Sequence, residues 1–358
     1  MPTYRSDLDS IPVYVPGRPI DEVARELGID SLDKLASNEC PEPPFPEVIE
    51  AIAASAAGVN RYPDNSVYEL SRAIARHQGV EANNVWVGSG SSEILRCAAL
   101  AVGGPGTSAV FADPSFVMYR IATMVAGSRA IPVPLTDSFD HDLGAMFSAI
   151  DDETTIVYVC NPNNPTGGHL AGSELTAFLD AVPEHVLVVI DEAYAEYVTA
   201  DDYQTFINEA PNRPNMLVAR TFSKIYGLAG LRVGYGVASS ELIGSLRRTQ
   251  APFTVTSAGQ AAALEALRHQ DQVAKRREAN DGGRRDLVRD LSALGYTPAP
   301  TEANFVYFEP DVDAAELGDA LLHRGQIVRV LGDGIRVTVG TASENDRFIE
   351  ALDTVTHS

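Results

Sequence analysis

Apolar and polar positions follow two different rhythms between residues 67 and 241. Short, continuously apolar runs are separated by stretches in which apolar residues recur every three or four positions. The first pattern predicts strands buried on both faces, and the second predicts amphipathic helices. The predicted strands are 85–87, 109–111, 131–134, 155–160, 186–190, 216–219 and 233–237, and the predicted helices are 67–77, 91–102, 116–125 and 173–182.

This alternation predicts an α/β domain with a mostly parallel central sheet covered by helices on both faces. After about residue 241 the pattern changes to long helices mixed with short strands, which predicts a smaller α+β domain. The predicted elements there are helices 257–269, 272–294, 314–323 and 343–354 and strands 304–308, 327–330 and 335–339. We therefore expect an N-terminal arm (1–30), a large domain (31–240) and a small domain (241–358).

The composition is that of a folded protein with an acidic surface. Of the 358 residues, 45% are hydrophobic and 21% are charged, and 27 basic residues face 49 acidic ones, for a net charge of −22. Such a balance argues against nucleic acid or an anionic membrane as a partner. The sequence opens on polar residues and has no apolar run near the ~20 residues that cross a bilayer, so we expect a cytoplasmic protein.

Three cysteines without a CxxC pair indicate neither a disulfide framework nor a zinc site. We expect no bound metal.

One lysine stands in an unusual setting directly after the strand 216–219. The segment from Arg220 to Arg232 combines Thr221, Ser223, Lys224 and small residues. A lysine amine kept neutral by burial or nearby cations forms a Schiff base with an aldehyde. Hydroxyls and an arginine beside it could hold a phosphate dianion. A surface lysine in a plain loop is the alternative.

Two further polar groups follow apolar strands. Asp191 directly follows the strand 186–190, where it could pair with a pyridinium nitrogen or simply cap the next helix. The polar turn Asn161–Gly168 follows the strand 155–160, at the edge where α/β sheets place ligands, although such a composition also suits a plain turn.

The segment Val87–Glu93 runs from a strand into a helix, and its small residues could form an anion site. Its spacing fits neither a dinucleotide fingerprint nor a P-loop.

Together these motifs resemble the fold-type I aminotransferases and, within them, the histidinol-phosphate aminotransferase family. The matching motifs, in chain order, are Asn60-Arg61-Tyr62-Pro63, Asn161-Pro162-Asn163-Asn164-Pro165-Thr166-Gly167, Asp191-Glu192-Ala193-Tyr194, the segment Arg220–Arg232, and Ile335-Arg336-Val337-Thr338-Val339-Gly340. The resemblance covers nearly the whole chain, and the ordered set is far more specific than any single motif.

The resemblance implies pyridoxal 5′-phosphate as cofactor and a role for each matching position. Lys224 would hold the cofactor as a Schiff base and shuttle the substrate's α-proton, and Asp191 would pair with the pyridine nitrogen. The other implied cofactor contacts are Asn164 and Tyr194 at the phenolic oxygen, Phe116 on the ring face, and Ser91, Ser92, Thr221, Ser223 and Arg232 at the phosphate.

The resemblance also implies a homodimer and a substrate site. Tyr62 would reach the cofactor phosphate of the neighbouring subunit. Arg336 would bind the carboxylate of the substrate or the phosphate of histidinol phosphate, and Arg329 and Tyr14 would lie near the substrate side chain.

Local departures favour one branch of the family. Ile225 stands where alanine is usual, which should affect packing more than chemistry. The segment 329–336 is shorter than in many histidinol-phosphate enzymes, and residues 11–17 and 251–257 look more like the aromatic, or phenylalanine, aminotransferases. We therefore expect ping-pong transfer from phenylalanine or tyrosine to 2-oxoglutarate, with histidinol phosphate as the alternative donor.

Two other hypotheses remain. A pyridoxal-phosphate decarboxylase on the same fold would release CO₂ from its substrate. A non-catalytic homologue would be expected to lack the lysine or its acid, and both Lys224 and Asp191 are present.

Overall fold

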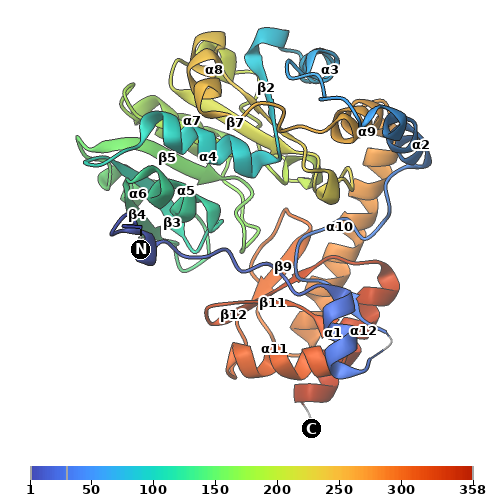
Figure 1. Ribbon diagram of the computed structural model, residues 1–358. Helices are drawn as coiled ribbons and strands as arrows, with labels where there is room; N and C mark the ends of the chain where they lie inside the picture. Colours follow the sequence, from blue (N-terminus) through green and yellow to red (C-terminus); the bar gives the residue numbers. More distant parts are fainter. Residues whose placement is uncertain (1, 30, 357–358) are drawn as a thin grey trace.

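The structure, a computed structural model, describes residues 2–29 and 31–356. A large α/β body stands above a smaller α+β body, and the long helix α10 runs from one to the other (Figure 1). The helices are α1 (Ile20–Leu27), α2 (Pro46–Ser55), α3 (Tyr68–Gln78), α4 (Ser91–Val102), α5 (Met118–Ala126), α6 (Leu143–Ser148), α7 (Gly172–Ala181), α8 (Ser240–Leu246), α9 (Ser257–Ala266), α10 (Gln270–Ala293), α11 (Ala314–His323) and α12 (Ala342–Thr356).

The large body is built on a seven-stranded sheet in the order β2-β8-β7-β6-β5-β3-β4. Its strands are β2 (Val85–Gly88), β3 (Ser108–Asp113), β4 (Arg129–Pro134), β5 (Thr154–Cys160), β6 (Leu187–Asp191), β7 (Met216–Thr221) and β8 (Gly234–Val237). All neighbours pair in parallel except β8, which is antiparallel to both β2 and β7. The predicted mostly parallel sheet is confirmed.

Both faces of the sheet are apolar because successive strand residues point to opposite sides. Val157 and Val188 pack into the cluster that holds α2, α3, α6, α7 and α9, whereas their neighbours Ile156 and Leu187 pack into the cluster that holds α4, α5 and α8. The continuous apolar runs of the sequence are thus explained by burial on two sides.

The small body contains the antiparallel sheet β11-β12-β9 and the pair β1-β10. Its strands are β1 (Asp33–Lys34), β9 (Phe305–Phe308), β10 (Gln326–Ile327), β11 (Arg329–Leu331) and β12 (Gly334–Thr338). The single strand expected at 327–330 is wrong in detail, because the chain leaves one sheet after Ile327 and enters the other at Arg329. The helix α2 was not anticipated.

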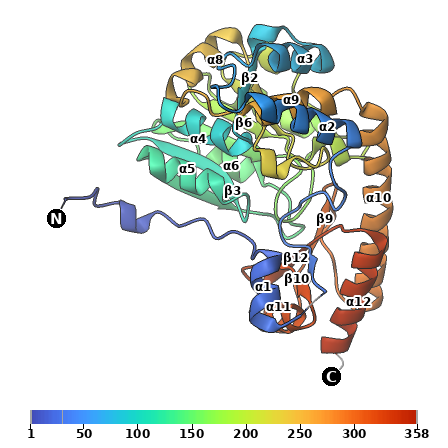
Figure 2. The same cartoon turned by 45° about the vertical axis from the view of Figure 1, so that its right-hand side comes forward.

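The division into arm, large domain and small domain remains a prediction, and the packing differs from its boundaries in two places. Helix α1 and strand β1 pack on the small body, where Val23 and Ala36 contact Ile327. Helix α9 packs against α2, and its Ala262 and Ala263 lie in the core of the large body. Residues 2–19 form the arm, which extends away from the small body (Figure 2), and its Arg5 donates to the carbonyl oxygens of Met124 and Val125 at the end of α5.

Within the part of the chain that the structure describes, no helix is both long enough and apolar enough to span a membrane. The same residues contain no group of three or more histidine, cysteine and acidic side chains arranged to bind a metal ion.

Candidate active site

Three of the sequence motifs meet at the carboxyl edge of the sheet. In the register of the strands, Cys160 at the end of β5 lies opposite Asp191 at the end of β6, and Asp191 lies opposite Ala219 near the end of β7. The polar turn after β5, the acid of β6 and the lysine segment after β7 are therefore neighbours. This is the edge at which open α/β sheets bind ligands.

Lys224 is partly buried just beyond β7. Its Nζ donates a hydrogen bond to the carbonyl oxygen of Ser37 at 3.2 Å and lies 5.6 Å from the ring centre of Tyr194. Burial, followed by the positive charge of Arg336, lowers the pKa of Lys224 from 10.5 to about 7. A large fraction of the amine is therefore neutral at neutral pH, the state in which it can act as a nucleophile or base.

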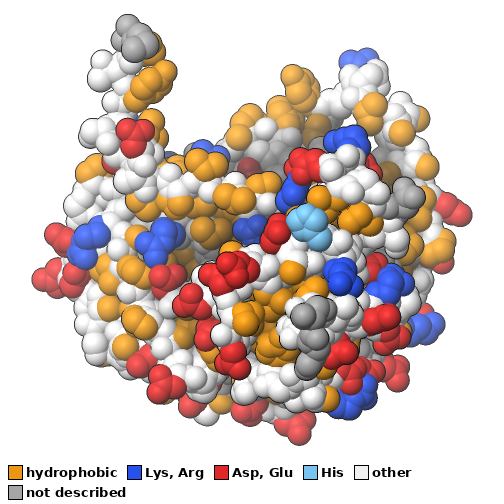
Figure 3. Space-filling model, turned by 90° about the horizontal axis from the view of Figure 1, so that it is seen from below, with side chains coloured by type: hydrophobic (Ala, Val, Ile, Leu, Met, Phe, Trp, Pro, Cys, Tyr) orange, Lys and Arg blue, Asp and Glu red, His pale blue; other side chains and the backbone are white. Residues whose placement is uncertain are grey.

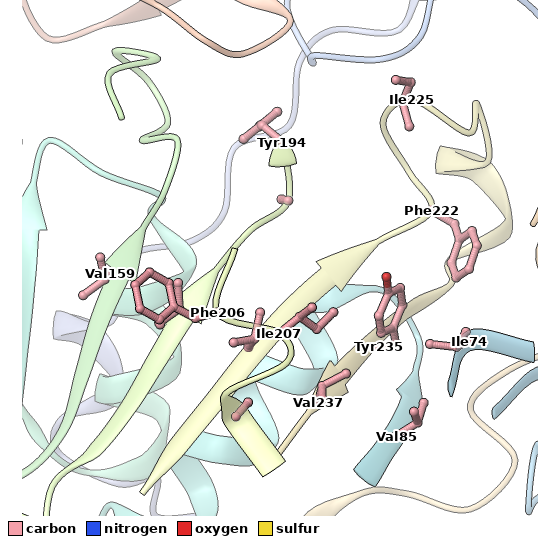
Figure 4. Close-up of a cluster of buried hydrophobic side chains, with 14 of the residues drawn as sticks. Ile74, Val85, Val159, Tyr194, Phe206, Ile207, Phe222, Ile225, Tyr235 and Val237 are labelled. Atoms are coloured by element: carbon pink, nitrogen blue, oxygen red, sulfur yellow. The ribbon is translucent and has the colours of Figure 1, made fainter. Parts of the chain in front are cut away.

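The residues on either side of Lys224 anchor it in the core. Phe222 and Ile225 are fully buried, and Phe222 packs against Tyr226 and Tyr235 at ring distances of 4.9 and 5.7 Å (Figure 4). Ile225, at the position where the family usually has alanine, belongs to the same apolar cluster. That it affects packing more than chemistry stays a prediction.

Asp191 is a buried carboxylate, 2% exposed, without a cationic partner in hydrogen-bonding contact among the described residues. Its Oδ2 accepts from the hydroxyl of Tyr119 at 3.0 Å and its Oδ1 from the backbone N–H of Ala193 at 3.2 Å. Burial raises the pKa of Asp191 from 3.8 to about 6, and the two hydrogen bonds offset part of that shift. A cationic ligand group placed beside it would favour the charged form.

Tyr194 and the segment Ala36–Asn38 close the site from the side of the small body. The hydroxyl of Tyr194 accepts from Nδ2 of Asn38 at 2.9 Å, and burial raises the pKa of Tyr194 above its usual value. The backbone N–H of Asn38 donates to Thr338 on β12, and its carbonyl oxygen accepts from Asn304. This segment thus connects the two bodies at the site.

The start of α4 and the side chain of Arg232 form a cradle for an anion. Gly90 caps α4 without a side-chain hydrogen bond, so the first N–H groups of this helix remain available to a ligand. Arg232 donates to Ser223 at 3.4 Å, and a Cβ added to Gly90 would begin 2.5 Å from its Nη2. Thr221 accepts from the N–H of Ser223 at 3.1 Å.

The sequence analysis also placed Ser91 and Ser92 at this cradle. They are the first two residues of α4, Ser91 being buried and Ser92 partly buried. Arg232 has a left-handed backbone, with φ +54°, which is rare for a residue with a side chain and typical of functional sites.

Arg336 and Arg329 lie directly opposite each other in the antiparallel hairpin of β11 and β12. Opposed residues of such a pair project from the same face of the sheet. Arg336 is 7% exposed, donates to the carbonyl oxygen of Ala36 at 2.7 Å and to Oδ1 of Asn164, and leaves its Nε without a partner among the described residues. Arg329 donates to the carbonyl oxygen of Val15 at 2.7 Å.

The pKa of Arg336 is lowered to about 10, chiefly by burial; the charge of Arg329 also lowers it, whereas Tyr194 and Tyr14 offset part of the shift. The charges of Arg329 and of Tyr14 in the arm therefore both act on Arg336. Tyr14 itself is half exposed.

Two of the expected site residues, Tyr62 and Phe116, make no described contact with Lys224 in this single chain. The ring of Tyr62 is 82% exposed and stacks on Phe253 at 4.7 Å, and none of its described contacts reaches Lys224. Phe116 is partly buried and meets Tyr119 edge to face, with ring centres 5.8 Å apart.

The sequence analysis missed Asn38 and Tyr119. Asn38 adopts a left-handed backbone, with φ +54°, which asparagine tolerates better than most residues, but no periodic pattern marked its segment. Tyr119 stands three residues after Phe116 and shares its side of the chain, so that spacing could have identified it.

The arrangement fits pyridoxal phosphate. A buried carboxylate suits a protonated ring nitrogen, the uncapped helix and Arg232 suit the phosphate, and the neutral amine of Lys224 suits the aldehyde. A Cβ on Gly234 would run into the backbone of Gly90 and Ser91, so small residues are needed for strand β8 to approach this cradle.

Comparison with known proteins identifies a family. Residues 32–352 match the family model described as aminotransferase class I and II. The histidinol-phosphate aminotransferase of Moorella thermoacetica is 46% identical over 98% of this chain and 92% of its own length, and the aromatic amino acid aminotransferase of Nocardia farcinica is 43% identical over 96% and 95%.

Among solved structures, histidinol-phosphate aminotransferase of Sinorhizobium meliloti in complex with pyridoxal 5′-phosphate superposes with a TM-score of 0.89 at 28% identity, covering 98% of both chains. Aspartate aminotransferase of Thermus thermophilus, at 24% identity and a TM-score of 0.86, shares the fold.

Proposed function

The chain belongs to the class I and II aminotransferases and is a fold-type I, pyridoxal-phosphate-dependent aminotransferase, and we propose that its amino donor is histidinol phosphate. The proposal is carried by the two arginines that face the same side of the β11–β12 hairpin.

The assignment of the reaction to individual residues follows from their environments. When bound, the cofactor supplies an aldehyde for the donor's amine and a ring that withdraws electrons from the α-carbon. Lys224, with an amine that is partly neutral at pH 7, would accept the proton of the donor's α-carbon and deliver it to the C4′ carbon of the cofactor. Asp191, a buried carboxylate, would keep the ring nitrogen of the cofactor protonated.

The remaining residues bind and orient. Asn164 and Tyr194 would hold the phenolic oxygen, and Phe116 would lie against the ring. Ser91, Ser92, Thr221, Ser223 and Arg232 would hold the phosphate, supported by the helix start.

The hairpin supports a phosphorylated donor because like charges directly opposite each other destabilise a strand pair. Arg329 and Arg336 lie in such a pair, and Arg336 is buried at the same time. A dianion between them would offset both costs, and a guanidinium is well suited to bind a phosphate. For the 2-oxo acid of the second half-reaction, Arg336 would bind a carboxylate.

The aromatic donor expected from the sequence has less support. Phe253, part of the segment that suggested it, stacks on Tyr62 at the surface and makes no described contact with Arg336. The short segment 329–336 turns out to be the tight hairpin that opposes the two arginines. An aromatic relative at 43% identity keeps phenylalanine or tyrosine as the second candidate.

The donor is tested by Arg329→Ala. Loss of one hydrogen-bonded charge should lower kcat/KM for histidinol phosphate by roughly 10- to 100-fold and that for phenylalanine by less than about threefold. The measurement is kcat/KM for both donors in the wild type and the variant, with Arg324→Ala, an exposed arginine at the end of α11, as the control. A wild-type preference for phenylalanine or tyrosine would replace the proposed donor and leave the aminotransferase assignment intact.

We also propose a homodimer in which Tyr62 completes the partner's phosphate site. The proposal is supported by the 82% exposure of the Tyr62 ring, stacked on a second exposed aromatic residue, Phe253. The arm likewise presents exposed apolar side chains, including Val13 and Val15, and stands away from the body (Figure 3). Apolar surface of this kind marks sites of protein association.

The shared site predicts complementation between two defective chains. Tyr62→Phe should raise the Kd for the cofactor roughly 10- to 100-fold without dissociating the dimer. Mixed with Lys224→Ala, it should recover activity and cofactor retention at limiting cofactor, because one site of each hybrid dimer has both residues intact. Tyr68→Phe, an exposed tyrosine on the neighbouring helix, serves as control. Absence of recovery despite demonstrated subunit exchange would rule out sharing.

A further inference from the structure

A buried tyrosine contacts the acid that we assign to the ring nitrogen. The hydroxyl of Tyr119, on α5, donates to Oδ2 of Asp191 at 3.0 Å. The other carboxylate oxygen accepts from the N–H of Ala193 at 3.2 Å. Each oxygen of Asp191 therefore has one donor supplied by the protein, and its remaining lone pairs are free to face a ligand.

Packing fixes the direction of the Tyr119 hydroxyl. The side chain is fully buried, its ring stacks on Tyr158 of β5 at 4.8 Å with an interplanar angle of 15°, and Phe116 meets it edge to face. Phe111 of β3 lies at 6.4 Å on the same side of the sheet. A donor whose rotamer is locked by its neighbours acts without reorganisation.

We propose that Tyr119 is a positioning residue for the reaction: its hydroxyl orients the Asp191 carboxylate and keeps it ionised, so that the ring nitrogen stays protonated. The inference rests on the proposed role of Asp191. Through Phe116, the same side chain also touches the residue expected on the ring face, and so it links two contacts of the cofactor.

The charges around the pair are consistent with this role. The titratable groups near Asp191 are Tyr119, Cys160 on β5, Glu192, Tyr194 and Lys224. Burial, together with Asp191 and Cys160, keeps the pKa of Tyr119 well above its usual value, so the hydroxyl always carries the proton that it donates. Burial raises the pKa of Cys160 to about 12, which leaves that thiol uncharged. Of the neighbouring groups, Tyr119 makes the largest contribution in favour of the charged form of Asp191.

The test is Tyr119→Phe, which keeps the ring and its packing and removes only the hydroxyl. In the holoenzyme, NMR of pyridoxal phosphate labelled with ¹⁵N at the ring nitrogen should show a smaller protonated fraction at pH 7 than in the wild type. The Kd for the cofactor should rise about tenfold, and kcat should fall roughly 10- to 100-fold while KM for the donor changes less than about threefold.

Tyr158→Phe is the matched control. Tyr158 is the stacking partner of Tyr119 and is equally buried, but its hydroxyl faces Thr123 and not Asp191. Equal effects of the two variants on the ring-nitrogen signal would show that packing alone is responsible, and an unchanged signal in Tyr119→Phe would equally overturn the proposal.

A double variant distinguishes the proposed role of Tyr119 from the proposed role of Asp191. In an Asp191→Asn background, Tyr119→Phe should have no further effect on the ring-nitrogen signal, because the interaction energy of a contacting pair disappears once one member is gone. If Asp191→Asn itself leaves the signal unchanged, the role of Asp191 is wrong. If Asp191→Asn abolishes it and Tyr119→Phe does not alter it, only the role of Tyr119 is wrong.

Discussion

Lys224→Ala is expected to abolish turnover, with kcat lower by at least about ten-thousandfold, while the protein still binds its cofactor. The variant removes both the amine that reacts with the aldehyde and the base that moves the α-proton, and the second function alone contributes roughly 10²- to 10⁴-fold in enzymes. Binding persists because the helix start, Ser223 and Arg232 do not depend on the lysine.

The measurement combines single-turnover rates with the amount of cofactor that remains after gel filtration. Lys275→Ala, an exposed lysine on α10, is the control and should behave like the wild type. Turnover near the wild-type rate in Lys224→Ala would refute the assignment.

The depressed pKa of Lys224 gives this prediction a pH dependence. At pH 7 about half of an amine with a pKa of about 7 is neutral, whereas less than about 0.1% of one at 10.5 would be. The rate at which the apoprotein captures pyridoxal phosphate should therefore rise with pH up to about 8 and then level off. A rate that keeps rising to pH 10 would show that the amine is not perturbed.

Much of the site could be predicted because it is attached to strands with a strong pattern. Asp191 and Lys224 directly follow apolar runs, and the carboxyl ends of neighbouring parallel strands meet at one edge. The pairing of Arg329 with Arg336 could also be predicted, because the two-residue turn at Gly332 and Asp333 fixes the strand register that places them opposite each other.

The role of Asn38 could not be predicted from the sequence, because it depends on tertiary contacts rather than on a local pattern. It bonds Tyr194, 156 residues away, and Thr338, 300 residues away, from a segment without helical or strand periodicity. The end of strand β10 at Ile327 was not predicted for a related reason. Three of the four residues 327–330 are β-branched, which predicts one strand, and only the pairing of β1 with β10 shows that the segment contributes to two sheets.

Asp191→Asn should lower kcat by roughly 100- to 1000-fold, as expected when one preorganised charge is removed from a buried site. The amide oxygen can still accept from the N–H of Ala193, and the amide nitrogen can donate to the Tyr119 hydroxyl, which is also an acceptor, so the local structure is retained. What it cannot do is hold a proton on the ring nitrogen, because a neutral group does not raise the pKa of a cationic acid. Asp137→Asn, an exposed carboxylate in the loop before α6, is a suitable control.

The same substitution should stabilise the apoprotein at neutral pH, which separates function from folding. The folded chain keeps a proton on Asp191 up to about pH 6, whereas the unfolded chain releases it near 3.8. Stability contributed by this group therefore falls as pH rises from about 4 to about 6 and stays low above 6. Two pKa units correspond to about 3 kcal/mol, which is an upper bound for the gain in free energy of unfolding at pH 8.

The variant must be compared with the wild type at each pH, because a second buried group, His141, changes the free energy of unfolding in the opposite direction over the same pH range. Burial lowers the pKa of His141 from 6.5 to about 4, so its contribution to stability rises between pH 4 and 6.5. The contribution of His141 is the same in the variant and the wild type, so it cancels in the difference between their free energies of unfolding. Urea unfolding of both apoproteins at pH 4 and pH 8 should give similar free energies at pH 4 and a more stable variant at pH 8. A variant that is less stable than the wild type at pH 8 would mean that the folded apoprotein favours the ionised form of Asp191. An equal difference at both pH values would mean that folding does not shift the pKa of Asp191, and either result would contradict the prediction.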